Sequence, residues 1–256
     1  RCLVERTWVW QCGIHPFGTD QLGRDILTRV LYGGRVSLLV GFIGALASTV
    51  LGSLLGAFAA YIGGVLDSVI SRLIDIMLSM PQIPLLLILS ALLSNREVVL
   101  GQMLDAWLGG SKSLFIIITV FISFYWMATA RLVRAEVLSL KSREFADAAR
   151  ALGGSHVRII LRHLLPNAVA VIIVQMTLMM GEAILVESGL SFLGLGIQPP
   201  AVSWGNMLSN AQGFLFRTNG IWLAIFPGLF IFLTVLFFNL LGDGLRDALD
   251  PRSVRK

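Results

Sequence analysis

Long stretches without a charged residue constrain this chain more than any other feature. Five runs contain no Asp, Glu, Lys or Arg, namely residues 36–66, 76–95, 113–130, 163–181 and 218–242. A helix of about 20 apolar residues crosses a hydrocarbon core of about 30 Å. Each run is therefore long enough to span a membrane once, with some tilt or a small extension. Continuous apolar runs favour helices over barrel strands, in which apolar and polar residues alternate.

The composition agrees with a membrane protein. The chain is 56% hydrophobic and 14% charged, whereas soluble domains carry about 25% charged residues. We predict an all-α polytopic membrane protein with five transmembrane helices. The domain division we expect is an N-terminal arm (1–35), one transmembrane domain (36–252) and a short cytoplasmic tail (253–256). The net charge of +5 matters through its distribution across the membrane and does not indicate nucleic-acid binding.

The N-terminal arm has its own pattern. Residues 22–31 place apolar side chains at helical spacing, with charged side chains on the other side, which predicts a helix lying at the membrane surface. The two cysteines, Cys2 and Cys12, also lie in the arm. We expect free thiols, and a disulfide is the alternative if the arm faces an oxidising compartment.

Small residues recur every four positions in the first run, at Gly44, Ser48, Gly52, Gly56, Ala60 and Gly64. Such a stripe lets a second helix approach closely. It predicts a tight helix contact, either within this subunit or with a partner.

Two prolines, Pro81 and Pro84, interrupt the second run. They predict a kink or a local opening of that helix, which either shapes a pathway or serves packing.

Basic residues crowd between the third and fourth runs, where seven Lys and Arg occur in residues 131–162. The positive-inside rule predicts that this segment is cytoplasmic. Counting spans then places residues 246–256 on the same side and residues 189–217 outside. The arm also falls outside, although its five arginines contradict the rule. A further span before the first residue would explain this placement.

The segment "FADAARALGGSHVRIILRHLLPN" (145–167) interrupts the apolar pattern. Apolar residues at 145, 148, 149 and 152 share one helical face, while charged residues at 143, 147 and 150 share another. Gly153 and Gly154 predict a helix end, Ser155 predicts the cap of a second helix, and Pro166 predicts the start of the next span. Two short helices joined by a glycine corner suit docking into a groove on a soluble protein.

These residues resemble a known family. Asp147-Ala148-Ala149, then Gly153, His163 and Leu165-Pro166, are similar to the "EAA" loop of permease subunits of bacterial ATP-binding cassette importers, with Asp in place of the usual Glu. The stretches "HPFGTDQLGRD" (15–25), "SFLGLGIQPPAVSWGNML" (191–208) and "LGDGLRDALDPR" (241–252) resemble the dipeptide, oligopeptide and nickel branch, in particular its second, C-type permease.

The resemblance implies a translocating subunit of the bacterial cytoplasmic membrane that performs no covalent catalysis. Its expected partners are a second permease, two ATPase subunits, an extracytoplasmic substrate-binding protein and membrane lipid. ATP and Mg would be bound by the ATPases, because this chain lacks a Gly-x-x-x-x-Gly-Lys-Ser/Thr motif. The residues that would couple to the ATPase are Glu144, Phe145, Asp147, Ala148, Ala149, Arg150, Leu152, Gly153, His156, His163 and Pro166.

Two carboxylates in the fourth span are candidates for the translocation pathway. A carboxylate in lipid is costly unless it faces the bundle interior. Glu182 serves either a polar pathway or an internal hydrogen bond, and Glu187 is expected to pair or cap structurally near the outer end. The segment 189–205, rich in Gly and Pro, forms part of an outer gate, a docking surface for a binding protein, or a plain re-entrant loop.

Metal binding is not expected. His15 belongs to the arm and His156 and His163 to the predicted coupling loop, and no cluster of Cys or carboxylates joins them. Structural or interface hydrogen bonding is the better interpretation of these histidines. The rival functions are a secondary transporter or channel, which would show inverted repeats or several intramembrane charges, and a membrane scaffold.

Overall fold

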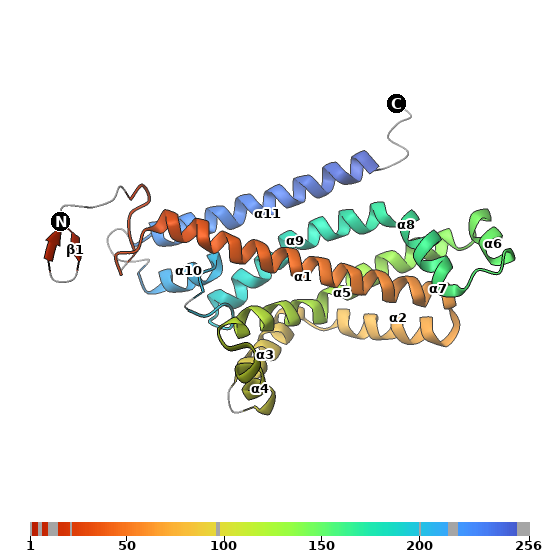
Figure 1. The fold of residues 1–256 in the computed structure, drawn as a ribbon, viewed down its shortest axis with the longest axis horizontal. Coiled ribbons are helices and arrows are strands. Elements are labelled where there is room, and N and C mark those ends of the chain that lie inside the picture. Colours follow the sequence, from red (N-terminus) through yellow and green to blue (C-terminus); the bar gives the residue numbers. More distant parts are fainter. Residues whose placement is uncertain are drawn as a thin grey trace.

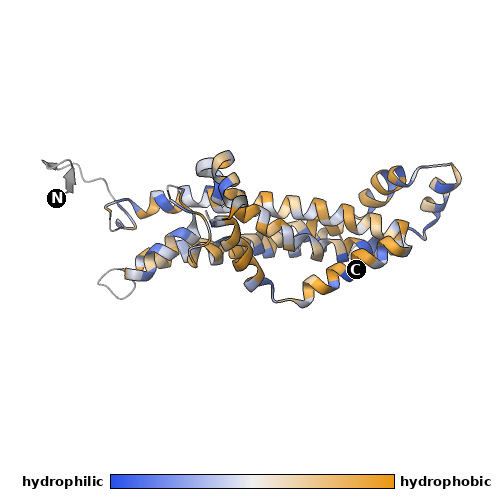
Figure 2. Ribbon diagram, turned by 90° about the horizontal axis from the view of Figure 1, so that it is seen from below, coloured by the Kyte–Doolittle hydropathy of each residue, from blue (hydrophilic) through white to orange (hydrophobic). Residues whose placement is uncertain are grey.

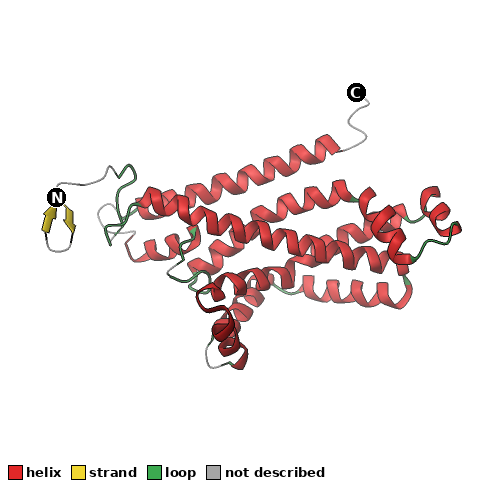
Figure 3. Cartoon of the chain, viewed as in Figure 1, coloured by secondary structure: helices red, strands yellow, loops and turns green. Residues whose placement is uncertain are grey.

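A computed structural model describes residues 2–4, 7–9, 15–20, 22–95, 98–199, 201–214 and 220–249. Figure 1 shows long helices lying side by side, with the short pair α3 and α4 projecting from the side of the bundle. Figure 3 shows that helices make up almost all of the described elements, apart from a small hairpin at the N-terminus. The tail 253–256 and Cys12 lie outside the described residues.

Four of the described helices are long and apolar enough to cross a membrane: α1 (Ile26–Ile62), α5 (Lys112–Leu140), α9 (Val169–Phe192) and α11 (Trp222–Leu249). A fifth crossing is the bent pair α2 (Gly64–Ser79) and α3 (Gln82–Ser94), if the pair is one span. Figure 2 shows hydrophobic residues along the length of the bundle and hydrophilic residues gathered toward its ends. The predicted all-α membrane fold is confirmed.

The remaining elements are short. They are the antiparallel strands β1 (Cys2–Val4) and β2 (Thr7–Val9), the helices α4 (Val99–Leu108), α6 (Glu144–Ala151), α7 (His156–Ile159), α8 (Leu165–Asn167) and α10 (Trp204–Ala211), the 3-10 turns η1 (Gly109–Ser111) and η3 (Gln212–Phe214), and the π-helical turn η2 (Ile160–Leu164).

The separate surface helix expected over residues 22–31 does not form. Asp25 caps α1 by accepting a hydrogen bond from the backbone N–H of Thr28 (2.7 Å), and α1 then continues for 37 residues. Ile26 and Val30 are buried in a cluster with residues of α9, α10 and α11. Ile26 and Val30 therefore face protein instead of lipid, whereas Leu22 (73% exposed) and Leu31 (57%) do not. From Ile26 onward the segment is part of the first span.

The stripe of small residues is used inside this subunit. Gly44, Ser48, Gly52, Gly56 and Ala60 are buried on α1, whereas Gly64 lies beyond the helix with φ 60°. A Cβ on Gly52 would lie 2.3 Å from the carbonyl oxygen of Trp126 on α5, and one on Gly56 would lie 2.3 Å from that of Ala130. Backbone thus meets backbone along α1 and α5, as small-residue stripes permit.

The second predicted span is broken. α2 and α3 meet at an angle of 93° at Met80 and Pro81, so the predicted proline kink is a full change of direction. α2 also begins earlier than the charge-free run, and Asp67 and Asp75 therefore lie within it. Arg134 of α5 donates to both carboxylate oxygens of Asp67 (2.6 and 2.8 Å), and Arg131 donates to Asp75. Ion pairs and a buried apolar cluster that contains Ile74 of α2 and Met127 of α5 together tie α2 to α5.

The fourth span is shifted toward the C-terminus relative to its predicted run of 163–181. α9 occupies Val169–Phe192, and the residues before it form η2 and α8. α9 packs against α1, where a Cβ on Gly41 would lie 2.9 Å from Ile184, and against α11, where one on Gly242 would lie 2.7 Å from Leu178.

We predict that Gly52→Ala destabilises the protein by about 1–3 kcal/mol, because the new methyl group overpacks a backbone contact. The measurement is the thermal unfolding temperature in detergent. Gly228→Ala is the matched control, since a Cβ at this helical glycine meets nothing within 4 Å. Equal unfolding temperatures for the two variants would contradict the assigned contact.

Candidate functional site

The predicted pair of short helices joined by a glycine corner forms beyond the end of α5. α6 covers Glu144–Ala151, Gly153 adopts φ 75°, and Ser155 caps α7 by accepting a hydrogen bond from the backbone N–H of Arg158 (3.4 Å). Positive φ is costly for residues with a side chain, so a glycine suits this position. The corner turns the chain from α6 into α7 and back toward the membrane.

The face of α6 that packs inward differs from the predicted one. Ala146 and Ala149 are buried and Phe145 is half-buried, but Ala148 is exposed and Leu152 is 89% exposed. The predicted apolar face is thus split between the protein core and the surface. Packing of Ala146 and Ala149 into the core shared with α1 and α5 selects this orientation, which the local spacing of residues does not specify.

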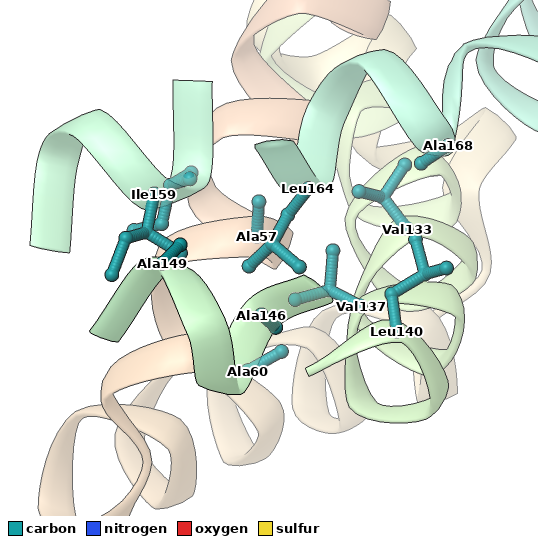
Figure 4. Close-up of a cluster of buried hydrophobic side chains, with 11 residues drawn as sticks. Ala57, Ala60, Val133, Val137, Leu140, Ala146, Ala149, Ile159, Leu164 and Ala168 are labelled. Carbon is teal, nitrogen blue, oxygen red and sulfur yellow. The ribbon is translucent and has the colours of Figure 1, made fainter. Parts of the chain in front are cut away.

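A core of small and branched side chains holds the two short helices against the bundle (Figure 4). Ala57 and Ala60 of α1 pack with Val133 and Val137 of α5. The contributions of the loop to the same core are Ala146, Ala149, Ile159, Ile160 and Leu164. Close packing of this kind makes α6 and α7 move with the ends of α1 and α5.

Polar contacts reinforce this attachment. Lys141 donates from Nζ to the carbonyl oxygen of Ala60 (2.7 Å), and Arg150 donates to the carbonyl oxygen of Lys141. Arg150 also pairs with Asp147 at 2.9 Å, and His156 meets the ring of Tyr61 edge-on at 5.5 Å. These contacts link the loop to the inner end of α1.

The other predicted loop residues lie around this core. Glu144 is exposed in the first turn of α6, His163 is half-buried in η2, and Pro166 is exposed in α8. Three large apolar side chains of the loop point away from the core: Leu152 (89% exposed), Val157 (51%) and Leu161 (48%). These exposed side chains leave the outer side of the loop open to contact.

Glu187 lies inside the bundle as a structural hub. It is fully buried, and it accepts hydrogen bonds from Ser37 of α1 (2.9 Å) and Ser191 of α9 (2.7 Å). The same hydroxyl groups accept from the backbone N–H groups of Trp204 (3.2 Å) and Ile197 (3.0 Å). One carboxylate therefore ties α1, α9 and the start of α10 together, as buried polar networks must be fully hydrogen-bonded.

The segment 189–205 is packed by this network instead of forming a loose loop. Asn206 donates to the carbonyl oxygen of Ile197 (3.0 Å), and Ser90 of α3 donates to that of Leu195 (2.7 Å). Trp204 donates through Nε1 to Val30 of α1 (2.8 Å). Sequence reasoning missed Ser37 and Ser90 because both lie more than 100 positions from their partners, and a lone serine in a span carries no local signal.

Glu182 is placed differently from Glu187. Its side chain is exposed on this chain, and it interacts electrostatically with Tyr125 of α5. It follows Val169, the first residue of α9, by about 20 Å of helix. Met179, three residues before it, is buried and accepts weak hydrogen bonds from Thr49 (3.6 Å) and Thr129 (3.2 Å).

Comparison with solved structures shows that this helical fold occurs in a known membrane protein. The inward-facing MetNI methionine ABC transporter aligns with a TM-score of 0.66 at 17% identity, covering 88% of this chain and 98% of that one. A second crystal form of the same transporter aligns with a TM-score of 0.63. At this identity the likeness shows the fold alone.

Sequence comparison shows the family. Residues 52–255 match the family described as binding-protein-dependent transport system inner membrane component. This chain belongs to that family and is a multi-pass protein of the inner membrane.

Curated relatives agree with this assignment. The dipeptide transport system permease protein DppC of Alkalihalophilus pseudofirmus is 45% identical over 93% of this chain and 72% of its own length. The oligopeptide transport system permease protein OppC of Haemophilus influenzae is 41% identical over 94% of this chain and 71% of its own length. The resemblance drawn from the motifs is thereby confirmed.

We predict that Glu187→Ala lowers the unfolding temperature strongly, because it leaves the hydroxyl groups of Ser37 and Ser191 without their buried acceptor. An unsatisfied buried group costs about 1–3 kcal/mol. The measurement is thermal unfolding in detergent, with Glu182→Ala as the control because that side chain is exposed. A similar stability loss in both variants would contradict the role of Glu187 as a hub.

Proposed function

We propose that this chain is one of two permease subunits of an ATP-driven importer of peptides or related small solutes. The names of its relatives, dipeptide and oligopeptide transport permeases, support the substrate class. The observation that carries the proposal is the segment 144–164, formed by α6, the glycine corner, α7 and η2. It leaves Leu152, Val157 and Leu161 exposed while its other side is packed into the bundle.

In this proposal, two separate ATPase subunits bind ATP and Mg and receive the exposed side of α6 and α7. A second permease completes the pathway, and an extracytoplasmic binding protein delivers the solute. The chain itself makes and breaks no covalent bond. Residues 131–162 are cytoplasmic, and the ends of the bundle that carry the N-terminal loop and α10 face outside, which follows from the basic residues in 131–162 and the positive-inside rule.

Movement of the ATPases is passed on through the shared core. Because Ala146, Ala149 and Ile159 pack against α1 and α5, a displacement of the short helices displaces the inner ends of both spans. Only Lys141–Arg143 connect α5 to α6, so α6 can move little without moving the end of α5. The permease therefore changes its opening when the ATPases close, a coupling between two sites through packed elements.

We predict that Gly153→Leu cuts uptake and transport-linked ATP hydrolysis while leaving the subunit inserted, because a side chain at φ 75° costs about 1–2 kcal/mol and redirects the corner. Ala148→Trp should have a similar effect, because a large side chain at this exposed position would block the surface that receives the ATPase. Ala149 is not a suitable position for this test, because it is buried and its substitution would disturb the core. The measurement is uptake and ATP hydrolysis in proteoliposomes.

Gly228→Leu is the control for these variants, since a Cβ at this glycine of α11 meets nothing within 4 Å and Gly228 lies in neither the loop nor α10. Full uptake by both Gly153→Leu and Ala148→Trp would show that this loop is not the coupling element.

Glu182 is proposed to line the pathway between the two permeases. An ionised carboxylate facing the lipid interior costs several kcal/mol, so intramembrane carboxylates face a bundle interior or water. Exposure of Glu182 on the isolated chain therefore supports coverage by the second permease or by the aqueous path. A negative charge there would attract the amino terminus of a peptide.

We predict that Glu182→Gln reduces uptake of cationic peptides more than uptake of neutral peptides, because Gln keeps hydrogen bonding and removes the charge. The measurement is uptake of two labelled peptides of equal length in proteoliposomes. Unchanged uptake of both would leave Glu182 with a structural role only.

A further inference from the structure

Hydrogen bonds hold the loop before α1 in a defined turn, at the end of the bundle that carries α10. Asp20 accepts hydrogen bonds through Oδ1 from the backbone N–H groups of Leu22 (3.0 Å) and Arg24 (2.9 Å). The ring of Phe17 stacks on Phe226 of α11 at 3.9 Å between centroids. This loop contains most of the stretch "HPFGTDQLGRD" (15–25), to which the proposed function assigns no role.

Two arginines share one carboxylate in this turn. Arg24 donates from Nε to Oδ2 of Asp20 at 2.8 Å, and Nε of Arg29 lies 3.6 Å from the same oxygen, beyond hydrogen-bond distance. The neighbouring Asp25 is engaged with His15 (3.0 Å) and with Thr28. A guanidinium group has five N–H donors, so the two arginines keep donors and positive charge for a further acceptor.

A cavity of about 170 Å³ lies beside these arginines. Asp20, the carboxylate between the two arginines, also lines the cavity. The remaining lining comes from the loop, the start of α1, α10 and the start of α11: Leu22, Ile26, Met207, Asn210, Ala211 and Leu223. Arg24 is half exposed, with 50% of its side chain accessible, whereas only 12% of the Arg29 side chain is accessible. The largely apolar lining strengthens an ion pair formed there. Sites for whole small molecules occupy about 300–1,000 Å³, so this cavity suits one inserted side chain better than a peptide.

The charge of this end is unusual for its side of the membrane. In the proposed orientation, Arg24, Arg29 and Arg35 lie outside, where the positive-inside rule disfavours them. Their charge works against the orientation that the basic cluster of residues 131–162 sets. A recognition role for an acidic partner gives a reason for arginines at this end.

We propose that the cavity between the 15–25 loop, α10 and α11 receives an acidic side chain of the extracytoplasmic binding protein, held between Arg24 and Arg29. This inference rests on the proposed function and its orientation. The two oxygens of this carboxylate would accept two hydrogen bonds from the guanidinium group of Arg29. They would replace the weak contact of Arg29 with Asp20, in which Nε and Oδ2 are 3.6 Å apart. This pairing would also bring the binding protein against α10, which the network of Glu187 joins to α1 and α9.

The test uses the complete importer in nanodiscs and its purified binding protein. We expect Arg29→Gln to weaken binding of that protein about tenfold or more and to reduce the salt dependence of binding. Arg29→Lys should give an intermediate loss, because lysine keeps the charge and lacks the fork. Co-elution of all subunits establishes that each variant is folded and assembled.

Arg35→Gln is the matched control, because Arg35 is exposed on the same end of α1, lies against Tyr32 and does not line the cavity. Equal weakening by Arg35→Gln and Arg29→Gln would show a diffuse charge effect and overturn the cavity. Unchanged affinity in Arg29→Gln, with a raised KM only for peptides that carry a free terminal carboxylate, would make the cavity a substrate site and also overturn the proposal.

Two further measurements separate this inference from the proposed function. In a variant in which Cys2 and Cys12 are replaced by Ser, Thr19→Cys, on the exposed part of the loop, should react with a membrane-impermeant thiol reagent from outside, and Ser142→Cys should not. The opposite pattern would overturn both the orientation and this inference. Normal uptake by the control variant, together with full binding-protein affinity in Arg29→Gln, would overturn this inference and leave the proposed function standing.

Discussion

The contact of α1 with α5 is the interaction on which the rest of this structure depends. At Gly52 and Gly56 the two backbones approach so closely that a single methyl group would meet a carbonyl oxygen at 2.3 Å. In a membrane, burial of apolar surface gives little drive for helices to associate, since lipid is as apolar as leucine, and close backbone packing replaces it. The remaining spans are arranged around this pair, and α9 packs on α1 through Gly41.

The same pair of helices holds the end of the bundle that carries α6 and α7. α1 supplies Ala57 and Ala60, and α5 supplies Val133 and Val137, to the core that receives α6 and α7 (Figure 4). The short helices have too few residues to be stable alone in water. They exist as helices because they are packed against two spans, and for the same reason a force on them reaches the membrane. The exposed Leu152 shows which side is left for a partner.

Two carboxylates on one helix illustrate how position decides the role of a residue type. Glu187 and Glu182 are five residues apart on α9, so their side chains point in different directions. Glu187 faces Ser37 and Ser191 and is fully buried, so its hydrogen bonds link α9 to α1. Glu182 faces outward from this chain, and because a charge in lipid is costly we propose that it lines the pathway.

The sequence by itself determined the membrane fold, the number of apolar runs, the break at Pro81 and the glycine corner at Gly153, because these follow from local chemistry and from the length needed to cross lipid. Only the tertiary structure decided which partner the Gly52 stripe meets, which face of α6 packs inward and which groups satisfy Glu187. Those outcomes depend on residues far apart in the chain: Ser37 lies 150 positions from Glu187. Periodicity shows that a face exists, but the neighbour that covers it is selected by packing among all the helices.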